Sequence, residues 1–157
     1  MLALFIALVA LSGVMSNPGG NFNGTWKLDR GNSDSSYDLL VAIGMSSFRS
    51  SMASRLDITD TYLISHRGVS IHRVTRYTDI TTLYLFGQEG NTEDHILGSG
   101  SHLTLFEDGQ IIYNFVRRSD GALYHSVKSI TVPNQMQVHM NFTLGSRFVS
   151  CRQRYVR

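Results

Sequence analysis

The chain has 157 residues, enough for one domain with a sizeable hydrophobic core. Its net charge of +2 is too small to indicate a nucleic-acid-binding protein, and no basic run with interleaved aromatic residues is present. The sequence therefore predicts a single globular domain without a nucleic-acid partner.

The start of the chain is typical of a secretory signal. Residues 1–14 carry no charge, and their hydrophobic run is too short to span a membrane. Ser16 is small enough to permit cleavage after it. We therefore expect a signal peptide at residues 1–16, a mature domain at residues 17–157 and a secreted protein. The lack of Lys or Arg near the start leaves an uncleaved anchor or a cytoplasmic protein as the alternative.

An opening strand and a short helix come first in the expected fold. Residues 21–28 combine an aromatic residue, a glycine and the only Trp with alternating polarity, which predicts a strand. After a polar break with several candidate caps, Tyr37, Leu40 and Val41 recur at helical spacing. Gly44 is expected to end this helix.

A second short helix is predicted over residues 46–53, so that the helical pair extends over about residues 34–53. Phe48 and Met52 lie four residues apart on its apolar side, and serines fill the other side. Such a helix needs packing to hold it, so we expect the pair to form a lid over a core.

From residue 59 onward, polarity alternates with the period of two that is typical of strands. Asp108-Gly109 and Asp120-Gly121 favour tight turns, because glycine tolerates positive φ. The poorly patterned residues 88–94 predict a weak or gapped pair. About ten short strands indicate a mainly β fold, a closed ten-stranded antiparallel barrel with room for one small ligand. After the opening strand, the strands are expected at residues 61–64, 69–77, 80–86, 88–94, 102–106, 110–116, 122–131, 135–143 and 147–156.

Catalytic and metal-binding patterns are weak in this sequence. The histidines are spread over separate strands and turns without metal-ligand spacing, at His66, His72, His95, His102, His125 and His139. No nucleophile elbow, phosphate-binding glycine loop or Cys-His pairing is present. The lone Cys151 cannot form an internal disulfide and is expected to be a small buried hydrophobe. We therefore expect a protein that is not an enzyme and holds no metal.

The last strand carries polar residues on the face that is expected to point inward. Alternation places Cys151, Gln153 and Tyr155 on one face, and Arg152 and Arg154 on the other, which points to water. A buried Gln and a buried Tyr need hydrogen-bond partners, because burying them bare costs a few kcal/mol each. Two interpretations stay open: a satisfied internal network with ordered water, or a polar anchor for the head group of a ligand.

Lys128 lies in a strand whose inner face alternation does not identify. Tyr124 and Ser126 share its face, whereas His125 and Val127 lie on the other. An inward Lys128 would be an unpaired cation that needs a carboxylate or another acceptor. An outward Lys128 would be an ordinary surface lysine.

Several motifs combine along the chain. They are FNGTWKL at residues 22–28, AIGM at 42–45, FGQE at 86–89, the Asp-Gly turns at 108 and 120, and CRQRY at 151–155. Together they resemble the intracellular lipid-binding proteins, the family of fatty acid-binding and cellular retinoid-binding proteins, over roughly residues 21–157. Lipocalins also begin with Gly-x-Trp, but helices directly after the first strand, the short chain and the lack of paired cysteines favour the former family.

The resemblance implies a clam-like barrel that encloses a wet cavity for one or two lipids, in a carrier with no catalytic activity and no cofactor. In the family the last strand reads Cys-x-Arg-x-Tyr, and its Arg and Tyr hold a fatty acid carboxylate. Here Tyr155 is kept and Gln153 stands at the Arg position, as in retinol-binding members. Lys128 falls where a second internal Arg is usual. The head-group residues implied are thus Lys128, Gln153 and Tyr155, for a long-chain fatty acid or, alternatively, retinol or another neutral lipid.

The resemblance also implies residues around the ligand tail and the entrance. Tyr37, Leu40, Met45 and Phe48 match the helical cap of the family, and Tyr77 falls near the aromatic residue at its portal. Most members are cytosolic, although secreted relatives exist in invertebrates. We expect a monomer whose lid and basic outer face touch anionic membranes transiently. A different function stays open, in which the outside of the barrel binds a receptor or a membrane surface.

Overall fold

The computed structural model describes residues 21–157. The predicted signal peptide at residues 1–16 lies outside the described residues. The elements in chain order are β1 (Gly24–Leu28), η1 (Arg30–Asn32), α1 (Tyr37–Ile43), α2 (Ser47–Ala53), β2 (Thr59–Ile64), β3 (Gly68–Val74), β4 (Asp79–Leu85), β5 (Glu89–Asp94), β6 (Gly98–Glu107), β7 (Gln110–Arg117), β8 (Leu123–Val132), β9 (Gln135–Leu144) and β10 (Arg147–Val156). None of the helices in residues 21–157 has the length and hydrophobicity that crossing a membrane requires.

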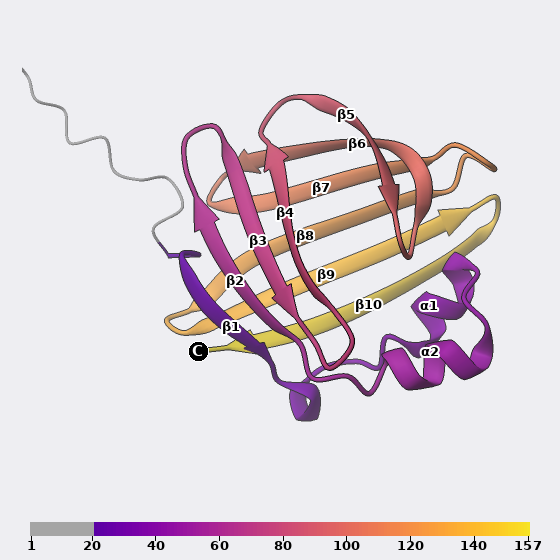
Figure 1. The fold of residues 1–157 in the computed structure, drawn as a ribbon, viewed down its shortest axis with the longest axis horizontal. Helices are drawn as coiled ribbons and strands as arrows, with labels where there is room; N and C mark the ends of the chain where they lie inside the picture. Colours follow the sequence, from indigo (N-terminus) through magenta and orange to yellow (C-terminus); the bar gives the residue numbers. More distant parts are fainter. Residues whose placement is uncertain (1–20) are drawn as a thin grey trace, which may run out of the picture.

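The ten strands form one antiparallel sheet in the order β4-β3-β2-β1-β10-β9-β8-β7-β6-β5. Because β1 pairs with both β2 and β10, the sheet curls round on itself, as Figure 1 shows. The predicted fold class is confirmed: mainly β, with ten antiparallel strands and two α-helices after the first strand.

Closure of the barrel is interrupted at one place. β4 and β5 are the two edges of the sheet, and no strand pairing joins them in the described chain. Beside this gap the Gly87 N–H donates to the Thr104 carbonyl at 2.8 Å, and Phe86 forms an isolated bridge with Thr104. The interruption falls at residues 88–94, where the sequence predicted a weak or gapped pair, although β5 itself pairs regularly with β6.

The tight turns depend on residues that accept a left-handed backbone. Asp108 and Gly109, with φ of 49° and 73°, join β6 to β7 in the conformation that a two-residue hairpin requires. Asn134, with φ of 63°, has the same role between β8 and β9. Gly44, with φ of 117°, ends α1 as predicted. Asp108, Gly109 and Asn134 thus fix the register of the hairpins that carry the inner face.

The strand predicted over residues 69–77 ends earlier in the structure. β3 stops at Val74, and the Thr75 N–H donates to the Thr78 carbonyl at 2.8 Å to close a turn. Tyr77 therefore lies in the turn between β3 and β4, and its side chain is 62% exposed.

The strand predicted over residues 102–106 is longer in the structure and begins at Gly98. Its first residues are small and polar, so they give no alternating signal. Gly100 is buried there, and a Cβ at this position would collide with the Val116 carbonyl and the Phe115 ring. The glycine is needed for the close approach of two strands.

The buried side of α1 agrees with the predicted one only at Leu40, which is buried. Leu39, Ala42 and Ile43 are buried as well, whereas Tyr37 and Val41 stay partly exposed. Contact with β9 and β10 selects this side, and Figure 1 shows α1 beside β10.

The prediction that the apolar side of α2 packs against the core was wrong. Its buried residue is Ser50, whose hydroxyl donates to the Met45 carbonyl at 3.4 Å. Phe48 and Met52 face solvent, and the Phe48 side chain is 75% exposed. A small serine lets this seven-residue helix approach its neighbours closely, whereas a phenylalanine would hold it away.

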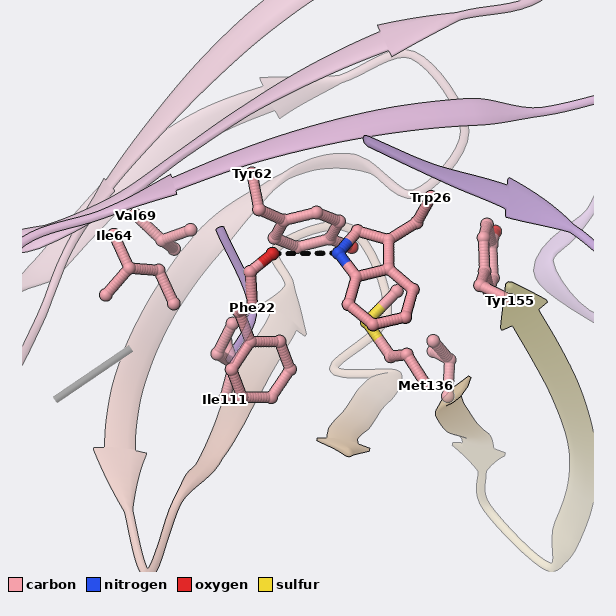
Figure 2. Packing of buried hydrophobic residues seen from close by; sticks show 9 residues of the cluster. Phe22, Trp26, Tyr62, Ile64, Val69, Ile111, Met136 and Tyr155 are labelled. Atoms are coloured by element: carbon pink, nitrogen blue, oxygen red, sulfur yellow. Dashed lines mark hydrogen bonds between the residues drawn. The ribbon is translucent and has the colours of Figure 1, made fainter. Parts of the chain in front are cut away.

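Two clusters of buried residues form the core. The first lies around β1, where Trp26 packs with Phe22, Tyr62, Met136 and Tyr155 (Figure 2). The Trp26 Nε1–H donates to the Phe22 carbonyl at 2.8 Å, so the indole is both packed and hydrogen-bonded.

The second cluster lies beneath α1. Leu39 and Ile43 of the helix belong to it together with Phe115, Phe142 and Cys151 from the strands. The Arg117 guanidinium donates to the Ile43 carbonyl at the end of the helix. This packing fixes α1 to the barrel, and Cys151 is buried as the sequence predicted.

Candidate ligand-binding site

A row of side chains crosses the inner face of strands β7 to β10. Lys128 is opposite Ile111 on β7 and Val138 on β9, and Val138 is opposite Gln153 on β10. Ile111, Val138 and Gln153 are all buried on the inside of the barrel. The question that the sequence left open is thereby answered, because Lys128 shares this face and points inward.

Gln153 and Tyr155 also point inward, as predicted. Both are buried, and the Tyr155 hydroxyl donates to Gln153 Oε1 at 3.3 Å. Burial raises the pKa of the Tyr155 hydroxyl, so this group is a neutral hydrogen-bond donor. The structure thus brings Gln153 and Tyr155 into contact, and Lys128 lies two strands away from Gln153 in the same row.

Lys128 is a cation in apolar surroundings. Burial, and to a smaller extent the charge of Arg73, lower the pKa of its ammonium from 10.5 to about 8, and Asp60 acts in the opposite direction. Within residues 21–157, no carboxylate lies at ion-pair distance from Lys128. Its amine is therefore available to a ligand.

An ion pair that sequence reasoning missed lies on the inner face of β2 and β3. Arg73 Nε and Nη2 donate to the two carboxylate oxygens of Asp60 at 2.8 and 2.7 Å. Asp60 is fully buried, whereas the Arg73 side chain keeps 43% of its surface exposed. The bidentate contact raises the pKa of Arg73 despite the opposing effect of its burial.

This pair had a detectable signal in the sequence. The predicted strand began at residue 61 and thus left out Asp60. Extending the alternation by one residue places Asp60 on the face of Tyr62 and Ile64. Arg73 shares its face with Ile71, and the register places Arg73 directly opposite Asp60.

The inner face also carries a chain of aromatic rings. Tyr84 lies edge-on to both His102 and Tyr113, and Tyr113 lies edge-on to Tyr124. Tyr84 and Tyr124 keep part of their surface accessible, although they point to the same side of the sheet as the core. These partly exposed rings give the inner face a surface that mixes apolar and polar groups.

Two recesses lie between α2 and the turn from β3 to β4, where the resemblance implies an entrance. One recess of about 220 Å³ is lined by Met45, Arg49, Met52, Ala53, Leu56 and Tyr77. A second recess of about 340 Å³ is lined by Met52, Arg55, Leu56, Asp57, Arg76 and Tyr77. Met52 and Tyr77 line both recesses, and each recess combines apolar side chains with at least one arginine.

No family model matches the chain, and no curated protein matches it by sequence. Its fold, however, closely matches solved structures. Lipid binding protein 8 of Caenorhabditis elegans in its apo form has a TM-score of 0.74 at 17% identity, over 87% of this chain and 95% of that chain. The Schistosoma mansoni fatty acid binding protein in complex with arachidonic acid has a TM-score of 0.73 at 15% identity, over 89% and 98%. Human cRBP IV has a TM-score of 0.68 at 14% identity, over 86% and 96%.

The chain has the fold of the intracellular lipid-binding proteins. The resemblance inferred from the sequence motifs is thereby confirmed for the fold. In this lipid-binding protein fold, the two-helix lid follows the first strand and the last strand returns to pair with it (Figure 1).

The residues predicted around the ligand tail are separated in this lipid-binding protein fold. Met45 and Tyr77 come together at the recess beside α2. Leu40 is a buried residue of α1, and Tyr37 is partly exposed at the start of the same helix. Phe48 is exposed on the outer surface and lines neither recess.

Proposed function

We propose that the protein binds a hydrophobic small molecule, a long-chain fatty acid, inside its barrel and transports it without chemical change. The observation that carries this proposal is Lys128, an inward cation with no carboxylate partner in the described chain. Gln153 and Tyr155 offer hydrogen bonds on the same face. A fatty acid has the matching chemistry, a carboxylate for these groups and a tail for the apolar interior.

Burial of the tail supplies most of the affinity in this proposal. Each buried CH₂ is worth about 0.8 kcal/mol, so a sixteen-carbon tail gains roughly 12 kcal/mol before association and ordering costs. The names of two structures with the same fold, a fatty acid binding protein with arachidonic acid and human cRBP IV, support a lipid as the cargo.

The entrance beside α2 suits a lipid that arrives from a membrane. Phe48, Met52 and Tyr77 are exposed apolar side chains, and Arg49 and Arg76 lie among them. Apolar residues enter the interface of a bilayer, and arginines attract its anionic head groups. We propose that a monomer touches membranes transiently with this surface.

Retinol or another neutral lipid is the alternative cargo. Gln153 favours it, because an amide hydrogen-bonds a hydroxyl and gives a carboxylate no charge. The two ligands differ in what they require of Lys128, since only the acid gains from its positive charge.

A displacement assay with a fluorescent fatty acid tests these proposals. We expect palmitate to bind more tightly than retinol. Lys128→Met should lower the affinity for palmitate by about tenfold or more, because a hydrogen bond to a charged group is worth about 1.5–3 kcal/mol. Gln153→Arg should increase the preference for the acid. Lys27→Met is the matched control, since Lys27 is exposed on β1.

Two outcomes would contradict the proposed function. A protein that binds neither palmitate nor retinol is not a lipid carrier, and a Gln153→Arg variant without increased preference for palmitate removes Gln153 from the head-group site. The competing function is binding of a receptor or a membrane surface by the outside of the barrel. It is favoured by Leu63 and Leu83, which are 65% and 64% exposed on the outer face of β2 and β4. This function requires that Gln153→Ala leave the binding properties of the protein unchanged.

We further propose secretion of the mature chain. The apolar start at residues 1–14 supports it. Expression of the full chain in a eukaryotic cell, followed by N-terminal sequencing of the protein in the medium, tests this proposal; a chain that keeps its first residues and stays inside the cell contradicts it.

A further inference from the structure

Lysine is scarce in this chain. Of its 14 Lys and Arg residues, only Lys27 and Lys128 are lysines. Lys27 is exposed on β1, whereas Lys128 points into the barrel. For a carboxylate alone an arginine would serve better, because its planar guanidinium forms two parallel hydrogen bonds. A lysine adds what arginine lacks, an amine that can lose its proton and act as a nucleophile.

The surroundings of Lys128 favour this neutral amine. Its neighbours across the sheet, Ile111 and Val138, are buried apolar residues. Burial and Arg73 together hold the pKa of Lys128 at about 8. Asp60 favours the charged form, but its carboxylate is already bonded to Arg73 through both oxygens. At neutral pH, on the order of a tenth of the chains therefore carry an unprotonated amine at this position.

We propose that Lys128 is a covalent docking site for a hydrophobic aldehyde, which enters the barrel as a lipid would. The Nζ lone pair attacks the aldehyde carbon, Nζ gives up two protons, and the aldehyde oxygen leaves with them as water, so that an imine joins the chain to its cargo. Neither an oxidant nor a reductant is consumed. Water reverses the reaction and releases the same aldehyde.

This inference rests on the proposed function, because the interior must first accept the tail of the aldehyde. A fatty acid would hold the same amine in its charged form as an ion pair, so the acid and the aldehyde are expected to compete for Lys128. Such competition would mean that the acid and the aldehyde bind at the same position in the barrel.

Trapping with hexadecanal tests the inference. The full chain is incubated with hexadecanal and sodium cyanoborohydride near neutral pH, and the hexadecyl adducts are located by peptide mass spectrometry. We expect at least about tenfold more adduct on Lys128 than on Lys27, because the lowered pKa of Lys128 increases its fraction of neutral amine. Excess palmitate should suppress the Lys128 adduct and leave the Lys27 adduct unchanged.

Variants and a denatured sample provide the controls. Lys27→Arg should leave the adduct on Lys128 in place, and Lys128→Arg should abolish it, since a guanidinium forms no such imine under these conditions. In urea-unfolded protein, the two lysines should react equally, because the preference is a property of the folded barrel.

Displacement by hexadecanol separates this inference from the proposed function. If hexadecanol and palmitate displace the fluorescent fatty acid but hexadecanal leaves no adduct on Lys128, the covalent site is refuted and the carrier function stands. Equal labelling of both lysines in the folded protein also refutes it. If none of these lipids enters the barrel, the proposed function fails, and the inference fails with it.

Discussion

Lys128, the proposed partner of the ligand, shows what a buried cation costs the fold that carries it. Its folded-state pKa of about 8 lies below the ordinary value of 10.5, because burial and Arg73 both disfavour the charge. Below pH 8 the folded and unfolded chains both carry the proton, so the folded state bears the full cost of burying a cation. Between pH 8 and 10.5 the unfolded chain binds more protons, and stability rises with pH.

We expect Lys128→Met to raise the free energy of unfolding at pH 7 by on the order of 2 kcal/mol, since it removes this buried charge. The advantage over wild type should shrink as pH rises from about 8 to about 10.5. Urea unfolding of both proteins across this pH range measures the difference in their free energies of unfolding. Lys128→Arg, which stays charged, is the control and should show no such trend. A constant difference between Lys128→Met and wild type would mean that Lys128 is solvated.

Asp60 and Arg73 show the opposite case, a buried charge that is paired. Asp60→Asn leaves the partly exposed Arg73 guanidinium without its counter-charge, and we expect a loss of about 1–3 kcal/mol of stability. The double variant Asp60→Leu/Arg73→Met removes both charges and should recover most of that loss. Urea unfolding of the three proteins measures it; a double variant as unstable as the single one would contradict this account.

Sequence reasoning at the residue scale succeeded where one strand could be read by itself. The inward positions of Gln153 and Tyr155 follow from alternation in β10, which has water on its other face. The direction of Lys128 did not follow, because both faces of β8 carry polar residues. The Asp60–Arg73 pair depends on the register between two strands, which no single strand specifies.

At the scale of elements, turn residues were more informative than helix faces. Asp108-Gly109 fixed a hairpin correctly, because only a positive φ allows that turn. The face of α2 was wrong, since seven residues give a weak periodic signal and the contact available to the helix favours a small Ser50 over Phe48. The start of β6 was missed because its glycines serve close packing instead of alternation.

Gly100 provides a test of that packing. We expect Gly100→Ala to cost about 1–3 kcal/mol, since its Cβ would meet the Val116 carbonyl and the Phe115 ring beneath the lid. Gly31→Ala is the matched control and should change stability by less than about 0.5 kcal/mol, because the nearest atom, Asp29 Oδ1, is 3.7 Å from its Cβ. Thermal unfolding compares the two variants. Equal stability would show that β6 and β7 move apart without cost.

At the scale of the whole molecule, the chain order of elements was enough to predict the fold. A strand, two short helices and a meander of hairpins permit few arrangements, and the curled sheet is the one that pairs β1 with β10. The packing inside was harder to predict, because it depends on how the rings of Tyr84, Tyr113 and Tyr124 meet across different strands.

The missing ladder between β4 and β5 makes the wall of this barrel elastic along one seam. Elsewhere, widening the wall would break the backbone hydrogen bonds of a whole strand ladder, but beside this seam the bond from the Gly87 N–H to the Thr104 carbonyl is the backbone link that the structure shows. We therefore expect the two edges to separate or approach, away from that link, by rearranging side chains. In the proposed carrier, such a seam would let the barrel adapt its capacity to thin or bulky cargo while the other strands keep their register.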